Sequence, residues 1–232
     1  MIDLHFWPTP NGYKTLILLE ELGCPYTLKP VNIMRGEQRD AGFLSLNPNG
    51  RMPALVDHAP KQGDAPLTVF ESGAMLQYLA SKHGTFGGTT PGEMAAVSSW
   101  LHWQMAGLGP NMGQSAHFHS FASEDVPYAK TRYRGEATRL LSVLTDQLDR
   151  GAYVAGAYSI ADMAIYPWLL ASELAGLGDL AEYARIRAYM DRIGARAAVQ
   201  RAYAVGAPVS DGQEIDEEAR RVLFGQTGED TP

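Results

Sequence analysis

The N-terminal third of the chain alternates between short apolar runs with strand spacing and longer runs with helical spacing. In IDLHFW, Ile2, Leu4 and Phe6 fall on one face, as in a half-buried strand. Apolar residues then recur at helical spacing over 13–22, just before a glycine of the kind that often ends helices. The same patterns predict a strand, a helix, two strands and a closing helix at 26–31, 36–46, 53–57, 67–70 and 71–84. This order predicts a thioredoxin-like α/β domain at 1–84.

A different pattern begins after the Gly/Thr/Pro linker GTFGGTTPGE. From Glu93 onward the apolar residues keep helical spacing without a convincing strand pattern, which predicts an all-α domain at 93–206. Helices are predicted at 93–106, 126–149, 159–174 and 179–193, with a break at GLGPNMGQ after the first. Ser159 and Asp162 have the spacing of a capping box, which indicates a structural role. Residues 207–232 are predicted to be a polar tail with one short helical pattern, IDEEARRVLF.

The composition disfavours several classes of partner. The 232 residues are 45% hydrophobic and 19% charged, as in an ordinary folded protein. A net charge of −7 and a pI near 5.3 argue against nucleic acid and anionic membrane surfaces, because both require a basic face. Neither a membrane span nor a secretory signal is expected. Cys24 is the only cysteine, so an internal disulfide cannot form, which fits a cytoplasmic location.

The turn FWPTPNGYK, between the first predicted strand and helix, is a candidate site for sulfur chemistry. In thioredoxin-like domains the helix that begins here stabilises a thiolate through its amide groups and dipole. This chain has PTPN there and no Cys-x-x-Cys, and Cys24 follows the far end of the helix, where a structural role is expected. Thr9 and Asn11 are favoured helix caps, and their side chains can also face a sulfur atom. Sulfur chemistry here would therefore require a sulfur atom supplied by a ligand.

Two further motifs combine a strand or helix terminus with open hydrogen-bonding groups. In RMPALV, Pro53 opens a strand after a loop, which predicts a cis peptide bond and leaves the amide and carbonyl of Met52 free for an added strand. The alternative is that Pro53 only shapes a turn. In FES, Ser72 is a natural helix cap that follows Glu71. Beside a free strand edge, the amide and hydroxyl of Ser72 would hold a carboxylate and Glu71 would meet an amino group.

These motifs resemble one known family. The chain is similar over residues 1–205 to the nu-class glutathione transferases of bacteria, nearest to their glutathione-dependent disulfide-bond oxidoreductases. The resemblance rests on colinear segments: MIDLHFWPTPNGYK, GEQ, NPNGRMPALVD, FESGAMLQYLA, WLHWQMAGLGPNMGQSAHF, VPYAKTRY and YSIADMAIYPW. It implies the glutathione transferase fold, a homodimer, glutathione as co-substrate without a metal, and reduction of small disulfides.

The resemblance also implies roles for single residues. Residues 6–12 contain neither the tyrosine nor the serine that other classes place in this turn, so Thr9 and Asn11 become the candidates for stabilising the glutathione thiolate together with the helix N-terminus. Tyr13 lies one turn into the helix, where a packed role is expected. Arg51 stands where relatives commonly have lysine, and whether it contacts ligand or solvent stays open. Glutathione is predicted to contact Asn11, Gln38, Met52, Pro53, Glu71 and Ser72, and Arg132 from the helical domain.

Three alternative functions use the same site. A conventional transferase would add glutathione to electrophiles, a peroxidase would reduce hydroperoxides, and a non-catalytic protein would bind glutathione as a regulator. Turnover of a small disulfide separates the proposed reductase from the regulator.

Two groups of residues could be taken for further functional sites. His102, His117 and His119 match no zinc spacing, so no metal site is predicted. An aromatic group is expected to lie mostly in the core, with some members lining an electrophile pocket between domains: Trp100, Trp103, Phe118, Tyr128 and Tyr133.

Overall fold

The computed structural model describes residues 1–61, 63, 65–210 and 215–225. They form two compact units. The first contains Met1–Met75 together with the described residues from Arg201 onward, and the second contains Leu76–Gln200. The domain boundaries expected from the sequence, at 84, 93 and 206, stay predictions.

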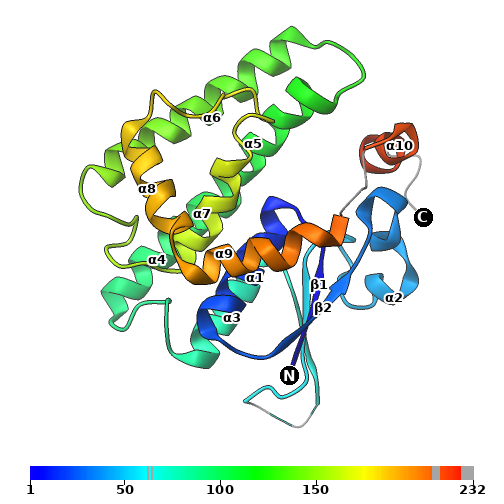
Figure 1. The fold of residues 1–232 in the computed structure, drawn as a ribbon, viewed down its shortest axis with the longest axis vertical. Coiled ribbons are helices and arrows are strands. Elements are labelled where there is room, and N and C mark those ends of the chain that lie inside the picture. The colour runs from blue at the N-terminus through cyan, green and yellow to red at the C-terminus, as the bar shows by residue number, and fades with distance from the viewer. Residues whose placement is uncertain (62, 64, 211–214, 226–232) are drawn as a thin grey trace. The chain divides into compact units, whose positions relative to one another are not determined.

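A four-stranded sheet is the centre of the first unit (Figure 1). Its strands are β1 (Ile2–Phe6), β2 (Tyr26–Pro30), β3 (Ala54–Asp57) and β4 (Leu67–Phe70), in the spatial order β2-β1-β3-β4. β1 is parallel to β2 and antiparallel to β3, and β3 is antiparallel to β4. Ile2, Leu4 and Phe6 are buried, as their spacing predicts. The sheet order and the helices described next confirm the thioredoxin-like prediction.

Helix α1 (Pro10–Leu22) follows β1, and α3 (Ser72–His83) follows β4. α1 begins three residues earlier than predicted, because proline has a fixed φ and no N–H and therefore suits a first helical turn. It ends at Gly23, which is left-handed with φ 60°, as the sequence indicates. The helix predicted at 36–46 is instead divided into η2 (Glu37–Arg39) and α2 (Ala41–Leu44), and a further 3-10 turn, η1 (Ile33–Arg35), precedes them. Gly36, at φ 85°, separates the two 3-10 turns η1 and η2.

The described residues of the second unit are helical or in connecting turns. Its helices are α4 (Pro91–Trp103), the π-helical turn η3 (Gln104–Leu108), α5 (Gly109–Ala116), the π-helical turn η4 (His117–Phe121), α6 (Pro127–Leu148), α7 (Ile160–Leu170) and α8 (Ala184–Gly194). α9 (Ala197–Gly206) begins in the second unit and ends in the first, where η5 (Ala207–Ser210) and α10 (Glu217–Phe224) follow. α10 confirms the short helix predicted from IDEEARRVLF.

The predicted break at GLGPNMGQ is wrong, because the chain stays helical through η3 and α5. Pro110 has no N–H to donate, and the wider π-helical turn before it accommodates this loss. Gly113 serves close packing, since a Cβ there would lie 3.2 Å from the Trp168 ring. The helix predicted at 159–174 ends at Leu170, the one predicted at 179–193 starts at Ala184, and α9 was not predicted.

The start of α7 is held by the predicted capping box, which is buried. Ser159 Oγ accepts a hydrogen bond from the Ala161 amide at 3.3 Å, and the Asp162 carboxylate accepts from the Ser159 amide at 2.9 Å. Asp162 also accepts from the Val154 amide (3.1 Å) and the Tyr189 hydroxyl (3.0 Å). Burial raises the pKa of Asp162 to about 6, although the four donors favour the ionised form. One carboxylate therefore joins the loop before α7 to α8.

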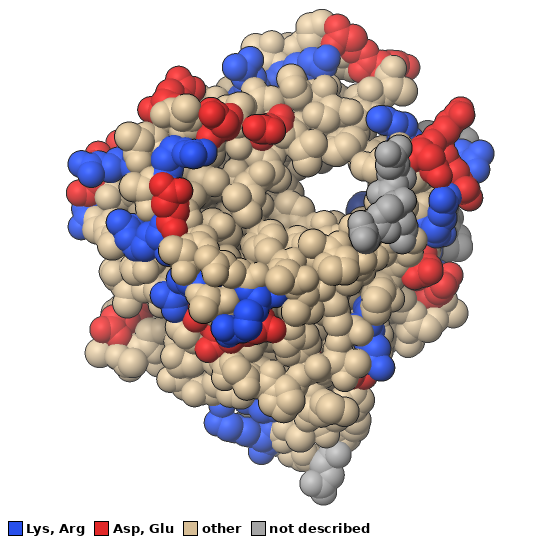
Figure 2. Space-filling model, in the orientation of Figure 1, with Lys and Arg blue, Asp and Glu red and all other residues tan. Residues whose placement is uncertain are grey.

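Both signs of charge occur side by side on the surface. On the face drawn in Figure 2, Lys and Arg are interspersed with Asp and Glu. Within the described residues, no helix combines the length and the apolar composition that crossing a bilayer requires.

Candidate active site

The turn between β1 and α1 places Thr9 at the start of a helix. Thr9 is the N-cap of α1, and its Oγ1 accepts a hydrogen bond from the Gly12 amide at 3.2 Å. The hydroxyl hydrogen is not used in that bond, so Thr9 can cap the helix and also donate to a ligand. Gly12 is required, because a Cβ there would lie 2.3 Å from the Trp7 carbonyl oxygen. This close approach accounts for the glycine of PTPNG.

Asn11 and Cys24 lie at opposite ends of α1. Asn11 is half-buried in the first helical turn. Cys24 directly follows Gly23, and its Sγ lies 3.9 Å from the Leu19 carbonyl oxygen. The 13 residues of α1 span about 20 Å. Because the helix dipole favours an anion only at the N-terminal end, the chain's single thiol is at the unfavourable end for a thiolate.

The Met52–Pro53 peptide bond is cis, as predicted. It directly precedes β3. Neither the amide nor the carbonyl of Met52 makes a hydrogen bond with another residue that the structure describes. An extended peptide beside this segment would find one donor and one acceptor on the same residue, as a neighbouring strand does.

Asn47 holds the loop before Met52 and was not singled out from the sequence. It is 2% exposed, and its Nδ2 donates to the Arg51 carbonyl oxygen at 2.6 Å while its Oδ1 accepts from the Asn49 amide at 2.9 Å. The run Asn-Pro-Asn-Gly is a turn signal that would have indicated it. The Arg51 side chain is exposed and makes no hydrogen bond or ion pair within the described part of the chain.

Glu71 and Ser72 form the junction between β4 and α3. Glu71 is left-handed at φ 68°, which is uncommon for a residue other than glycine and is often found at functional sites. Its carbonyl oxygen accepts the Met75 amide at 2.9 Å, so Glu71 occupies the cap position. The prediction that Ser72 caps the helix is therefore wrong: the sharp turn at Glu71 makes Ser72 the first helical residue. Ser72 is 4% exposed, whereas Glu71 is exposed.

A buried lysine, which the sequence pattern did not predict, lies one turn into α1. Lys14 is 1% exposed. Burial lowers its pKa to about 7, against the attraction of Glu71, which raises it. Lys14 is the only charged residue in PNGYKTLILL, and residues on every side of this helix are buried. A single charged residue within such an apolar run is the sequence pattern that would have indicated a buried lysine.

Replacing Lys14 by methionine is expected to stabilise the fold at pH 7 by on the order of 1 to 3 kcal/mol, because a buried charge is replaced by an apolar chain of similar volume. The folded-state pKa lies below the unfolded one, so the unfolded state binds more protons between about pH 7 and 10.5, and the wild type gains stability as pH rises through that window. The advantage of Lys14→Met should therefore shrink by about 2 kcal/mol between pH 7 and pH 9.

Urea unfolding of the wild type and of Lys14→Met at both pH values measures this difference, in which the other titrating groups cancel. A variant that is less stable than the wild type by the same amount at both pH values would contradict the prediction.

Gln38 lies in η2 and is 6% exposed. Its Oε1 is buried and has no hydrogen-bond partner among the described residues. Such an acceptor is uncommon, because leaving it without a donor costs stability. The Gln38 carbonyl lies beside the Asn47 loop, since a Cβ at Gly50 would be 3.4 Å from its oxygen. Gln38 and the loop that leads to Met52 are therefore neighbours within the first unit.

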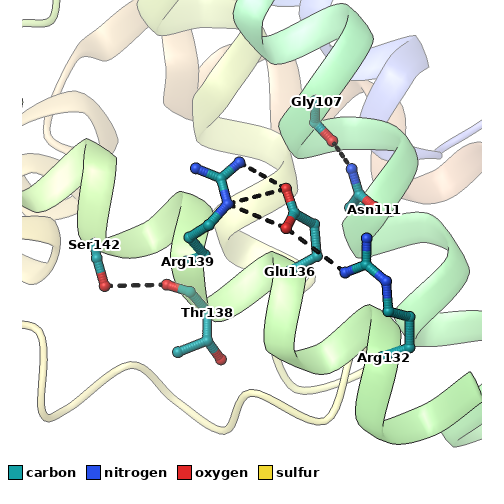
Figure 3. Close-up of polar contacts among 7 residues, drawn as sticks. All are labelled: Gly107, Asn111, Arg132, Glu136, Thr138, Arg139 and Ser142. Atoms are coloured by element: carbon teal, nitrogen blue, oxygen red, sulfur yellow. Dashed lines mark hydrogen bonds and ion pairs between the residues drawn. The ribbon is translucent and has the colours of Figure 1, made fainter. Parts of the chain in front are cut away.

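Arg132 belongs to the second unit, where it lies exposed on α6. Figure 3 shows Arg132 and Arg139 on either side of Glu136. An Arg132 nitrogen is 3.7 Å from the Glu136 carboxylate, whereas Arg139 Nη2 is 2.6 Å from it. Hydrogen bonding to Arg139 holds the pKa of Glu136 below its usual value. Arg132 is thus the more loosely held arginine, and its contact with glutathione stays a prediction.

The aromatic group is not in the core. Tyr128 is 81% exposed, and the others are only partly buried: Trp100, Trp103, Phe118 and Tyr133. Tyr13 is packed as expected, 8% exposed and stacked on Tyr203 with ring centroids 4.0 Å apart. Across the described ranges, no three His, Cys, Asp or Glu residues gather in a way that could hold a metal ion.

Residues 1–81 match the family model for the glutathione S-transferase N-terminal domain. Two proteins of Escherichia coli K12 are similar to this chain. Disulfide-bond oxidoreductase YfcG is 44% identical over 87% of this chain and 94% of its own length. Disulfide-bond oxidoreductase YghU is 39% identical over 86% of this chain and 73% of its own length. The crystal structure of a glutathione transferase from Pseudomonas putida, with one glutathione disulfide bound per subunit, has 37% identity and a TM-score of 0.81. This match covers 87% of this chain and 90% of that one.

Proposed function

Because this chain belongs to the glutathione S-transferase family, we propose that it reduces small disulfides with glutathione, through a thiolate bound at the start of α1. It is an enzyme of that family, similar over most of its length to two disulfide-bond oxidoreductases. The same resemblance supports placing it in the nu class.

The observation that carries the proposal is the distribution of thiol and polar groups along α1. Cys24 lies after the C-terminal end of the helix, whereas Thr9 and Asn11 occupy the N-terminal end, where an anion is stabilised. The enzyme thus offers a place for a thiolate but no thiol of its own there. Glutathione supplies the missing sulfur atom.

The loops of the first unit suit the rest of the tripeptide. The free amide and carbonyl of Met52, next to Pro53, pair with the glutathione backbone as an added strand would. The N-terminus of α3 at Ser72 binds the γ-glutamyl carboxylate through its amide groups. The exposed carboxylate of Glu71 forms an ion pair with the α-amino group. Gln38 gains a hydrogen-bond partner for its buried Oε1. Arg132 on α6 is a further proposed glutathione contact, which rests on the family resemblance alone.

The reaction needs only thiol chemistry of glutathione. A free thiol with a pKa of about 8.5 is a few per cent ionised at pH 7, and lowering that pKa by about two units makes most of it anionic. Thr9 Oγ1, the Asn11 amide and the helix N-terminus supply this by hydrogen bonding to the thiolate. The thiolate attacks one sulfur of the disulfide, and the other sulfur leaves as a thiolate that takes up a proton. A second glutathione thiolate then attacks the mixed disulfide, which releases the second reduced thiol and glutathione disulfide.

We further propose a homodimer in the cytoplasm. The edge strand β4 exposes Leu67 and Phe70, each 40% accessible, and the second unit exposes Met94 (50%) and Tyr128 (81%). Exposed apolar side chains of this size are typical of protein interfaces. A single cysteine suits a reducing compartment. Light scattering at micromolar concentration tests the dimer, and a monomer alone would refute it.

Turnover of hydroxyethyl disulfide with glutathione tests the function. We expect reduction by the wild type and, within about twofold, by Cys24→Ala, because Cys24 lies about 20 Å from the start of α1. A loss of two orders of magnitude in folded Cys24→Ala would mean that the protein's own thiol carries the reaction. No disulfide turnover by a wild type that binds glutathione would favour a transferase, a peroxidase or a regulator.

A further inference from the structure

The C-terminal helix α10 lies against η1 and the loop that carries Gln38, far from it in sequence but within the same unit (Figure 1). Asp216 caps α10, accepting the Ala219 amide at 2.7 Å. Ala219 is fully buried although the helix has only eight residues. A Cβ at Gly36 would lie 3.6 Å from Val222 Cγ1. α10 is therefore packed on the loop rather than extended into solvent.

Two arginines of the η1–η2 loop, Arg35 and Arg39, contact α10 near its two ends. Arg35 Nη1 is 2.6 Å from the Glu218 carboxylate, and its Nη2 is 3.0 Å from Asp216. Arg39 Nη2 donates to the Val222 carbonyl oxygen at 2.7 Å, near the C-terminal end of the helix, where carbonyl groups lack partners. Figure 2 shows acidic and basic side chains side by side at the edge of the molecule where α10 lies.

Gln38 lies between Arg35 and Arg39 in the sequence. Two further contacts, which do not involve α10, also fix the loop that carries it. The Glu37 carboxylate accepts the Asn32 amide at 2.6 Å, which closes the loop on itself. The Gln38 carbonyl is beside Gly50 in the loop that leads to Met52. A change in the position of α10 would therefore move η2. Through η2 it would also move the segment before the cis proline.

We infer that α10 is a positioning element of the glutathione site, which holds the η1–η2 loop in the conformation that presents Gln38 to glutathione. This inference rests on the proposed function. The role of α10 is in binding and not in the chemical step, because the thiolate is stabilised at the start of α1. Undocking α10 should therefore raise the KM for glutathione and leave kcat nearly unchanged.

Substitutions in the full-length chain test this inference. Ala219→Glu places a bulky charge on the buried face of α10, and we expect it to raise the KM and the Kd for glutathione about 3- to 10-fold, because the loop must then be ordered by the ligand. Glu218→Lys breaks only one partly exposed ion pair, so about a twofold effect is expected. Glu217→Lys is the matched control: it makes the same charge change on the neighbouring residue, whereas the ion pairs of Arg35 within the described residues are with Asp216 and Glu218, and it should leave both constants unchanged.

Two measurements separate the possible failures. Trypsin cleavage at Arg220 and Arg221, followed by mass spectrometry, reports whether α10 has left the loop, and calorimetry reports glutathione affinity. Faster cleavage of Ala219→Glu with unchanged affinity and KM overturns the positioning role and leaves the proposed function standing. A wild type that binds no glutathione overturns both. A parallel fall in kcat at saturating glutathione would show that α10 acts on the chemical step instead.

Discussion

Replacing Thr9 and Asn11 together by alanine is expected to lower disulfide turnover at pH 7 by about 3- to 25-fold, while glutathione affinity stays within about twofold. In the proposed mechanism the variant loses two hydrogen bonds to the bound thiolate, so the thiol pKa should rise by about 1 to 2 units. Affinity should be preserved because, in the proposed function, the tripeptide is held by Met52, Ser72 and Gln38 in other loops. The amide end of α1 persists, so activity should be reduced rather than abolished.

A titration of thiolate absorbance in the glutathione complex decides between the two roles of these residues. We expect the turnover of the double variant to recover above about pH 9, where the thiol ionises without help. Thr9→Ser is the matched control, because it keeps the hydroxyl that caps α1 and that we propose donates to the ligand. If the double variant folds, binds glutathione and titrates with the wild-type pKa, then Thr9 and Asn11 are only helix-capping residues.

The second large effect concerns stability. Asp162→Ala should cost about 3 to 5 kcal/mol of unfolding free energy at pH 7, because it leaves buried donors from Val154, Ser159 and Tyr189 without an acceptor. At this pH the carboxyl is ionised, since its pKa is about 6. Tyr189→Phe is a milder comparison that removes one donor and should cost about 1 kcal/mol.

The pH dependence of Asp162 has a defined sign. Its folded-state pKa of about 6 lies above the ordinary value of 3.8, so the folded state binds the proton more tightly. Its contribution to stability is therefore full below about pH 3.8 and falls, by about 3 kcal/mol, as pH rises through about 6. Comparing urea unfolding of the wild type and of Asp162→Asn at pH 4.5 and pH 7 isolates this term. A difference between the two proteins that is the same at both pH values would contradict it.

Local sequence signals predicted the structural features that depend on residues close together in the sequence. The face of β1, the turn at Gly23, the capping box at Ser159 and the cis bond before Pro53 all follow from residues within a few positions. The order of strands and helices was enough for the thioredoxin-like sheet.

Features that depend on distant packing were not predictable in this way. Lys14 is buried because the whole circumference of α1 is covered, which helical spacing alone does not reveal. Gly113 signals a break in isolation, but its backbone approaches Trp168, a partner 55 positions further along the chain. The contact of Arg35 with Glu218 spans 183 positions and has no local signature. The glutathione contacts predicted for Gln38 and Arg132 rest on the family resemblance, because each residue alone is an ordinary polar residue.

The first unit is built from both ends of the chain, which has a consequence for synthesis on the ribosome. Tyr203 stacks on Tyr13, and Arg201 Nε is 2.8 Å from the Glu20 carboxylate. Gly206 approaches so closely that a Cβ would lie 2.6 Å from the Tyr13 ring. These contacts cannot form until the chain has been translated past Gly206, and the intervening residues take on the order of ten seconds to add. During that interval the nascent first unit leaves this side of α1 uncovered, so protection from aggregation matters most before the C-terminal end emerges.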